Sequence, residues 1–116
     1  MENEIENTTD VYIFVDEYID SFVSWDILLF FYHNPTAVES PAGLAARLGR
    51  SEDDVTDAIK VLHRKGALKS DGDGIFRYDP EPDLSKRMKR FNDSLASSST
   101  RLSILSQMLM KGRSNP

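Results

Sequence analysis

Apolar residues between Val11 and Phe31 recur at steps of three and four, which is the period of an α-helix. The pattern predicts a first helix over this stretch, with two variants: a short helix ahead of it, or a second segment capped by Ser24. Asn34 precedes a proline and is pushed out of the α region, so the helix is expected to end there. Residues 1–10 are polar and acidic, and we expect them to form a disordered N-terminus.

Two short helices follow, each with its own start and stop signals. Ser40-Pro41 supplies a hydroxyl at the N-cap and a proline at the first helical position, and the first helix is expected to stop at Gly49. Ser51 with Asp54 three residues later resembles a capping box, and Gly66 is a candidate left-handed cap at the other end of the second helix. The apolar faces consist of Leu44, Ala45 and Leu48 in the first helix, and of Val55, Ala58, Ile59 and Leu62 in the second.

After Gly66 the helical period gives way to alternation. Residues 67–70 and 75–78 are typical of short strands, and the two Asp-Gly pairs between them predict a β-hairpin. Together with the helices, this hairpin predicts a mainly α fold with a small β-hairpin, of the α+β class.

Residues 83–110 return to helical spacing after two prolines. Their apolar positions alternate in steps of four and three, with Ser98 as the polar exception, which is the pattern of a heptad seam. We expect one long amphipathic helix that pairs with its twin, since a lone helix would leave a leucine stripe in water. The alternative is that the helix folds back on its own domain. The expected dimerisation residues are Leu84, Met88, Phe91, Leu95, Leu102, Leu105 and Leu109.

A chain of 116 residues has room for one core. We therefore divide it into an acidic N-terminus (residues 1–10), one folded domain (residues 11–80) and a C-terminal helix (residues 81–116). The sequence has no run of eighteen apolar residues and no basic segment ahead of an apolar one at its start. A cytoplasmic protein with no membrane partner is the expectation.

Charge is distributed unevenly along the chain. Residues 1–26 carry eight acids and no Lys or Arg, residues 27–83 carry ten acids and seven bases, and residues 84–116 carry one acid and seven bases. The net charge of −5 argues against a surface that binds phosphate throughout, but the basic C-terminal segment leaves room for a local basic patch. Its densest part consists of Lys86, Arg87, Lys89 and Arg90, which are expected either to touch DNA flanks or to form the solvated face of the helix.

The sequence offers little for catalysis. It has no cysteine, which excludes disulfides, a thiolate nucleophile and cysteine-based metal sites. His33 and His63 are thirty residues apart without a ligand-spaced partner, and no phosphate-binding glycine pattern is present. We expect no enzyme activity, no cofactor and no metal.

The stretch SPAGLAARLGRSEDDVTDAIKVLHRKGALKSDGDGIFRY (residues 40–78) resembles the winged helix-turn-helix family. The resemblance is carried by Leu44-Ala45 and Leu48-Gly49, by the helix that follows Ser51, and by the Asp-Gly tip of the hairpin. It is closest to small bacterial regulators of the MarR and PadR type. The resemblance implies a homodimeric, DNA-binding transcriptional regulator with a long C-terminal dimerisation helix.

In that family the second helix of the pair enters the major groove of double-stranded DNA, and the hairpin, or wing, touches the backbone or the minor groove. A small hydrophobic effector pocket near Trp25 and residues 30–32 is a further alternative. The candidate DNA-binding residues are Arg50, Ser51, Glu52, Thr56, Asp57, Lys60, Lys69 and Arg77.

The predicted DNA-reading helix departs from a strong DNA binder. Between Ser51 and Lys65 there are four acids and three bases, and all four acids lie in the first two turns. A carboxylate is repelled by phosphate, although Glu52 or Asp57 can accept a hydrogen bond from cytosine N4. Acids in a first turn also stabilise the helix dipole whatever the function. The alternative function is therefore a winged-helix protein-interaction module that no longer binds DNA.

Overall fold

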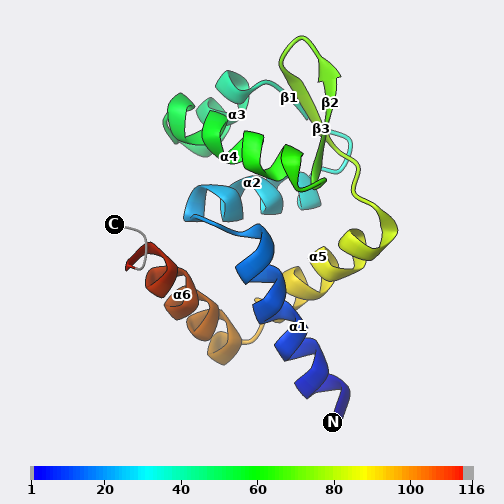
Figure 1. The fold of residues 1–116 in the computed structure, drawn as a ribbon, viewed down its shortest axis with the longest axis vertical. Helices are drawn as coiled ribbons and strands as arrows, with labels where there is room; N and C mark the ends of the chain where they lie inside the picture. Colours follow the sequence, from blue (N-terminus) through cyan, green and yellow to red (C-terminus); the bar gives the residue numbers. More distant parts are fainter. Residues whose placement is uncertain (1, 114–116) are drawn as a thin grey trace.

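The computed structural model describes residues 2–113, and side-chain burial is defined for residues 9–110. Over this range the chain is mainly helical, with a small three-stranded antiparallel sheet (Figure 1). The elements are α1 (Glu2–Tyr18), α2 (Phe22–His33), β1 (Val38–Glu39), α3 (Pro41–Leu48), α4 (Glu52–Arg64), β2 (Leu68–Gly72), β3 (Ile75–Tyr78), α5 (Pro82–Ser94) and α6 (Ser98–Arg113). In Figure 1, α2, α3, α4 and the sheet form the upper part, and α1, α5 and α6 the lower part.

The two central helices follow their sequence signals. The Ser40 hydroxyl accepts a hydrogen bond from the Gly43 amide at 3.1 Å, and the Ser51 hydroxyl accepts one from the Asp54 amide at the same distance. Between the helices, Gly49 adopts the left-handed conformation with φ of 66°, which a residue with a side chain rarely does. The predicted bounds of α3 are confirmed, and α4 begins one residue after its cap.

The hairpin is also confirmed, and the structure adds a strand to it. β3 lies in the centre of the sheet, between β1 and β2. Three successive residues at the tip, Gly72, Asp73 and Gly74, have positive φ, which explains the Asp-Gly pairs there. Strand β1 pairs Val38 with Arg77, but two residues are too few to give an alternating pattern in the sequence.

The first predicted helix is two helices in the structure. Ser21 caps α2 by accepting a hydrogen bond from the Ser24 amide at 3.1 Å, so the expected capping role of Ser24 is wrong. Ser24 lies inside α2 and is buried. The variant with a separate helix ahead of the main one has the right number of helices, but α1 has 17 residues and is not short.

Residues 2–10, expected to be disordered, form the first part of α1; Met1 lies outside the described residues. A tertiary partner explains this difference. Val11 and Phe14 are buried in the core, and Asp10 forms an ion pair with Arg90 of α5 at 3.0 Å. Asp10 thus gains a charged partner, and Val11 and Phe14 just after it gain apolar contacts, that only the fold supplies.

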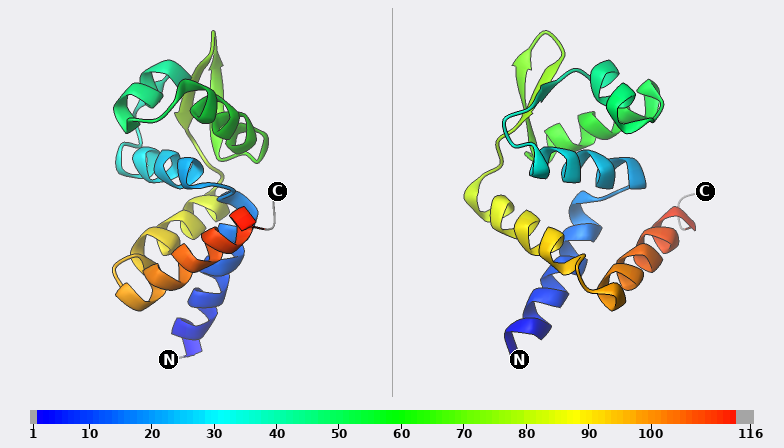
Figure 2. Two further views of the ribbon diagram at one scale, coloured as in Figure 1. Left: turned by 90° about the vertical axis from the view of Figure 1, so that its left-hand side faces the viewer. Right: turned by 180° about the vertical axis from the view of Figure 1, so that it is seen from behind.

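The single C-terminal helix expected over residues 83–110 is wrong, because the structure breaks it into α5 and α6. At the break, the amides of Leu95, Ala96 and Ser97 bond three residues back instead of four, so the chain tightens after α5 before α6 begins. The Ser97 hydroxyl then accepts a hydrogen bond from the Thr100 amide at 3.3 Å, at the start of α6. The chain turns here, and α6 runs back beside α1 (Figure 2).

Phe91 joins the two parts of the molecule. Its ring centroid lies 5.5 Å from that of Phe14 on α1 and 5.4 Å from that of Trp25 on α2, the latter edge to face. Edge-to-face aromatic pairs add to the stabilisation from burial. The boundary that we expected between the folded domain (residues 11–80) and the C-terminal helix (residues 81–116) therefore divides elements that share one apolar core.

Candidate functional site

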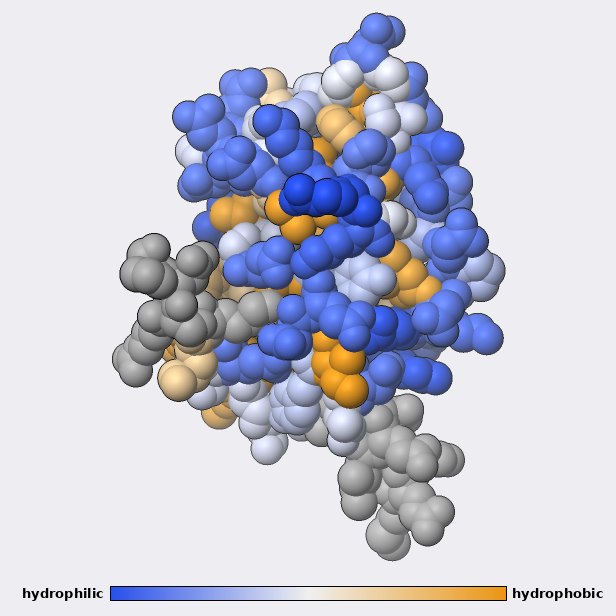
Figure 3. All heavy atoms as spheres, viewed as in Figure 1, coloured by the Kyte–Doolittle hydropathy of each residue, from blue (hydrophilic) through white to orange (hydrophobic). Residues whose placement is uncertain are grey.

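Helix α4 exposes one long face next to the hairpin. Val55, Ile59 and Leu62 are buried against the core, so the opposite face, which includes Asp53 and Lys60, points to solvent. The helix has 13 residues and is therefore roughly 20 Å long. The space-filling view shows a largely hydrophilic surface with hydrophobic residues in separate small patches (Figure 3).

The hairpin is fixed beside this helix by an aromatic contact. The His63 ring on α4 lies 5.7 Å from the Phe76 ring on β3, edge to face. On the same hairpin Lys69 and Arg77 are opposite each other in the register of β2 and β3. The fold thus brings the predicted residues of α4 and of the hairpin to neighbouring elements.

Three arginines of this region, Arg47, Arg50 and Arg77, are held by acids of the same chain. Arg50 contacts Asp26 of α2 at 2.6 Å, and Arg47 pairs with Glu39 of β1. Arg77 donates to both Asp71 at 2.7 Å and Asp79 at 2.8 Å. These bonds raise the pKa of Arg77 and, with the charge of Lys69, lower the pKa of Asp79.

Three cations near α4 and the hairpin make no ion pair within the described part of the chain: Lys60, Arg64 and Lys69. Arg64 was not among the residues predicted for the site. Arg64 lies four residues after Lys60 and therefore shares a helix face with Lys60. This spacing in the sequence is the signal that could have identified Arg64.

The other residues that were predicted to contact DNA differ in burial and in whether their side chains already have a partner. The Ser51 hydroxyl is occupied as the cap of α4, and Thr56 is half-buried. Glu52 and Asp57 are exposed, as are Asp53 and Asp54, and none of these four carboxylates forms an ion pair among the described residues.

The basic cluster of α5 packs largely against α1. The Arg87 guanidinium lies 3.3 Å from Glu17 and over the rings of Phe14 and Tyr18, at 5.5 and 5.7 Å from their centroids. Arg90 pairs with Asp10 of α1. The remaining members are exposed: Lys89 binds Asp93 at 2.7 Å, which raises the pKa of Lys89, and Lys86 makes no ion pair among the described residues.

The expected dimerisation residues do not form one stripe. On α5, Leu84, Met88 and Phe91 are buried within their own chain. Leu95 at the break and Leu105 are half-buried, whereas Leu102 is 66% exposed and Leu109 is 59% exposed. On α6 the residues that face the core are instead Ile104 and Met108.

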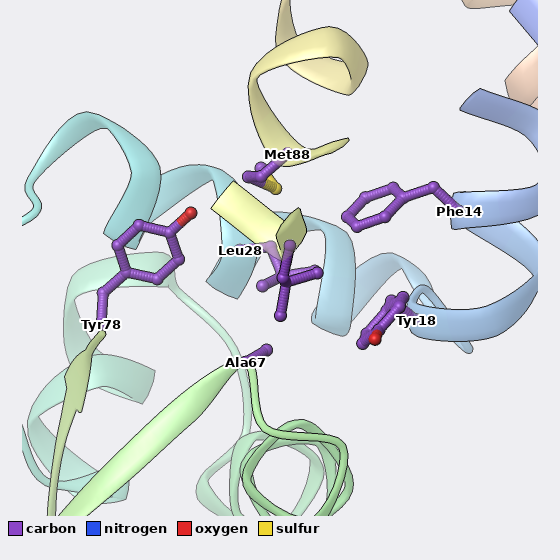
Figure 4. Close-up of a pocket in the computed structure, with 7 residues that line it drawn as sticks. Phe14, Tyr18, Leu28, Ala67, Tyr78 and Met88 are labelled. Carbon is purple, nitrogen blue, oxygen red and sulfur yellow. The ribbon is translucent and has the colours of Figure 1, made fainter. Parts of the chain in front are cut away.

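A narrow gap lies where α1, α2, α5 and the hairpin meet (Figure 4). It leaves no space for a water-sized molecule, and its lining does not include Trp25, near which an effector pocket was expected. Its lining residues are Phe14, Tyr18, Leu28, Ala67, Tyr78, Leu84 and Met88. The Tyr78 hydroxyl is buried without a hydrogen-bond partner among the described residues, and burial raises the pKa of Tyr78 to about 12.

Within residues 2–113, no group of three His, Asp or Glu side chains that could hold a metal ion was found. None of the described helices is long and apolar enough to cross a membrane. Comparison with known proteins gives no match to a family model, a curated protein or a solved structure.

Proposed function

We propose that this protein is a DNA-binding transcriptional regulator of the winged helix-turn-helix type, with α3 and α4 as the helix pair and β2–β3 as the wing. One observation carries the proposal: the exposed face of α4 lies beside a hairpin on which Lys69 and Arg77 stand opposite each other. A helix of this length, flanked by a hairpin that carries two cations, fits a major groove roughly 12 Å wide and the phosphates at its edge.

In this proposal the residues of α4 and the wing have separate roles. Lys60 and Arg64 on α4, and Lys69 on β2, contact phosphates, because their charges have no ion-pair partner within the described chain. Thr56 and Asp57 lie nearer the start of α4, where base edges are read. Arg77 joins the phosphate contacts only after it exchanges Asp71 or Asp79 for phosphate.

The number of unpaired cations sets the expected strength of this binding. Each phosphate that a cation neutralises contributes about −0.9 to the slope of log K against log salt concentration. Three such cations predict a slope of about −3 per protomer, which is modest for a DNA-binding protein. The carboxylates in the first turns of α4 weaken non-specific binding further, so sequence selectivity must come from base contacts.

We also propose that the regulator acts as a homodimer in the cytoplasm. The support comes from α6, which leaves Leu102, Leu109 and Met110 exposed on a helix whose opposite side packs on α1. A second copy would remove this apolar surface from water. The interface is then a short α6 face and not a coiled coil along residues 83–110.

Selection of bound duplexes from a random pool at low salt tests the function. We expect enrichment of a palindrome with two half-sites, as two-fold symmetric dimers bind. Failure to enrich any sequence at the lowest salt would contradict the proposal.

A second candidate function is a protein-docking module, and a specific observation favours it. Glu52, Asp53, Asp54 and Asp57 are exposed, and three of the nearby arginines, Arg47, Arg50 and Arg77, are already neutralised by acids of the chain. Replacing Glu52 by Gln and Asp57 by Asn together distinguishes the two. A regulator gains non-specific duplex affinity from this change, while a docking module shows no duplex binding in either form.

A further inference from the structure

On the side of α4 that faces the start of α2, an open surface hollow of about 410 Å³ lies between the two helices. The wing contact through His63 is on a different side of α4, because Asp54, Asp57 and Val61 follow one another at helical steps of three and four. The lining residues are Asp20, Ser21, Val23, Ser24, Asp54, Asp57, Ala58 and Val61.

The lining combines an apolar interior with acidic edges. Ala58 is buried and Val23 and Val61 are half-buried, whereas the carboxylates of Asp54 and Asp57 are exposed. No lysine or arginine lines the hollow. The hydroxyls of Ser21 and Ser24 lie 3.2 Å apart and bond each other.

The three carboxylates of the lining are not equivalent. Asp20 is already paired with Lys65 at 3.2 Å, so part of its charge is neutralised within the chain. Asp54 and Asp57 make no ion pair in the part of the chain that the structure describes. These two acids therefore give the hollow its net negative charge.

We propose that this hollow docks a basic amphipathic segment of a partner protein. The aliphatic stems of Lys or Arg, or an apolar side chain beside them, would lie on Val23, Ala58 and Val61, with the cationic ends at Asp54 and Asp57. Charge complementarity of this kind fixes register and speeds association. The wing contact uses another side of α4, and Asp57 is the one lining residue that the proposed DNA-reading face shares.

Two other occupants fit the hollow less well. Sites for small molecules bury about 70–90% of the ligand surface, and an open hollow between two helices does not enclose a small organic cation to that extent. A nucleic acid would bring its phosphates against Asp54 and Asp57, with no cation in the lining to offset the repulsion.

The test uses the full-length protein and a helical peptide of about 14 residues, made of Leu and Lys at amphipathic spacing, as the probe. Amide NMR spectra are followed during titration at low ionic strength. We expect shift changes concentrated at Val23, Ala58 and Val61. Changes confined to the wing or to α6 would overturn the proposal.

Matched variants separate this hollow from general attraction to an acidic protein. Asp54→Asn with Asp57→Asn is expected to weaken peptide binding about five-fold, because two exposed charge pairs are lost. Glu52→Gln with Asp53→Asn removes the same charge from the same helix outside the hollow, and should change the affinity less than about two-fold. Equal losses in the two variants would overturn the proposal.

A further variant probes the apolar part without changing charge. Val61→Gln is expected to weaken the peptide about three-fold while leaving the amide spectrum of the free protein otherwise that of the folded wild type. Spermine and a short DNA duplex serve as competing probes. If spermine shifts the same resonances, or the duplex shifts those of Val23 and Val61, with comparable affinity, the assignment to a protein segment is wrong.

Discussion

Arg77 on β3 stands directly opposite Lys69 on β2, but the two cations are not equally available, because Asp71 and Asp79 hold the Arg77 guanidinium. Lys69 makes no such bond. A hairpin that carries two bases in the sequence thus presents one cation without an ion pair among the described residues.

The first prediction follows from this difference. Asp71→Asn together with Asp79→Asn should release Arg77, tighten non-specific duplex binding and steepen the salt slope by about one. Fluorescence anisotropy at several salt concentrations measures both. Asp73→Asn at the hairpin tip is the control, because it removes a nearby charge that pairs with no cation in the described chain and Asn tolerates the positive φ there. An equal gain per charge in the control would show that Arg77 was already free.

The packing of α5 on α1 gives a stability prediction. Arg87 combines ion pairs with Glu17 and Asp10 with its position over two aromatic rings, and its side chain is only 15% exposed. Arg87→Ala should lower the free energy of unfolding by about 1–3 kcal/mol. Urea denaturation checks this, with Lys86→Ala on the exposed side of the same helix as the control. A loss no larger than in the control would contradict the role of Arg87.

Assembly is tested on α6. Leu102→Ser with Leu109→Ser should convert the dimer to a folded monomer, because both side chains are exposed within one chain. Light scattering gives the mass, and circular dichroism gives the fold. Ile104→Val, at a buried position of the same helix, should cost about 0.5–1.5 kcal/mol of stability without changing the mass. A wild-type monomer would disprove the proposed dimer.

Tyr78 predicts how stability responds to alkali. Its hydroxyl is buried without a hydrogen-bond partner, and its pKa of about 12 lies above the value of about 10 for an unfolded chain. The native state therefore holds this proton more tightly, and the stability that Tyr78 contributes is lost as pH rises from about 10 to about 12. Tyr78→Phe should be neutral or stabilising near pH 7 and should remove this part of the alkaline loss. Urea unfolding of both proteins over this pH range measures the difference. Parallel curves would contradict the assignment.

Local signals predicted the central part of the fold. The Ser40 and Ser51 caps, the Gly49 turn and the Asp-Gly tip each act within a few residues, so one sequence is enough to place them. The break between α5 and α6 was visible in the same way, in the serine run that begins at Ser97, but the heptad spacing on either side favoured a continuous helix.

Ion pairs between residues that are distant in the sequence could not be predicted from local patterns. Arg50 meets Asp26 across 24 positions, and Arg87 meets Glu17 across 70, so their charges looked available for DNA when the fold had already paired them. Asp10 in α1 makes a similar long-range contact with Arg90. The sequence therefore predicted the helix and the hairpin of the candidate site, but it did not reveal which of the charged side chains there are already paired.

The most direct test of DNA binding is the salt dependence of affinity for the enriched duplex, compared between wild type and Lys60→Ala with Arg64→Ala. These two cations carry no ion pair in the described chain and share the exposed face of α4. We predict a wild-type slope of about −3 per protomer that falls to about −1 in the variant. Equal slopes, or an affinity independent of salt, would contradict the account that α4 is the helix that enters the DNA groove.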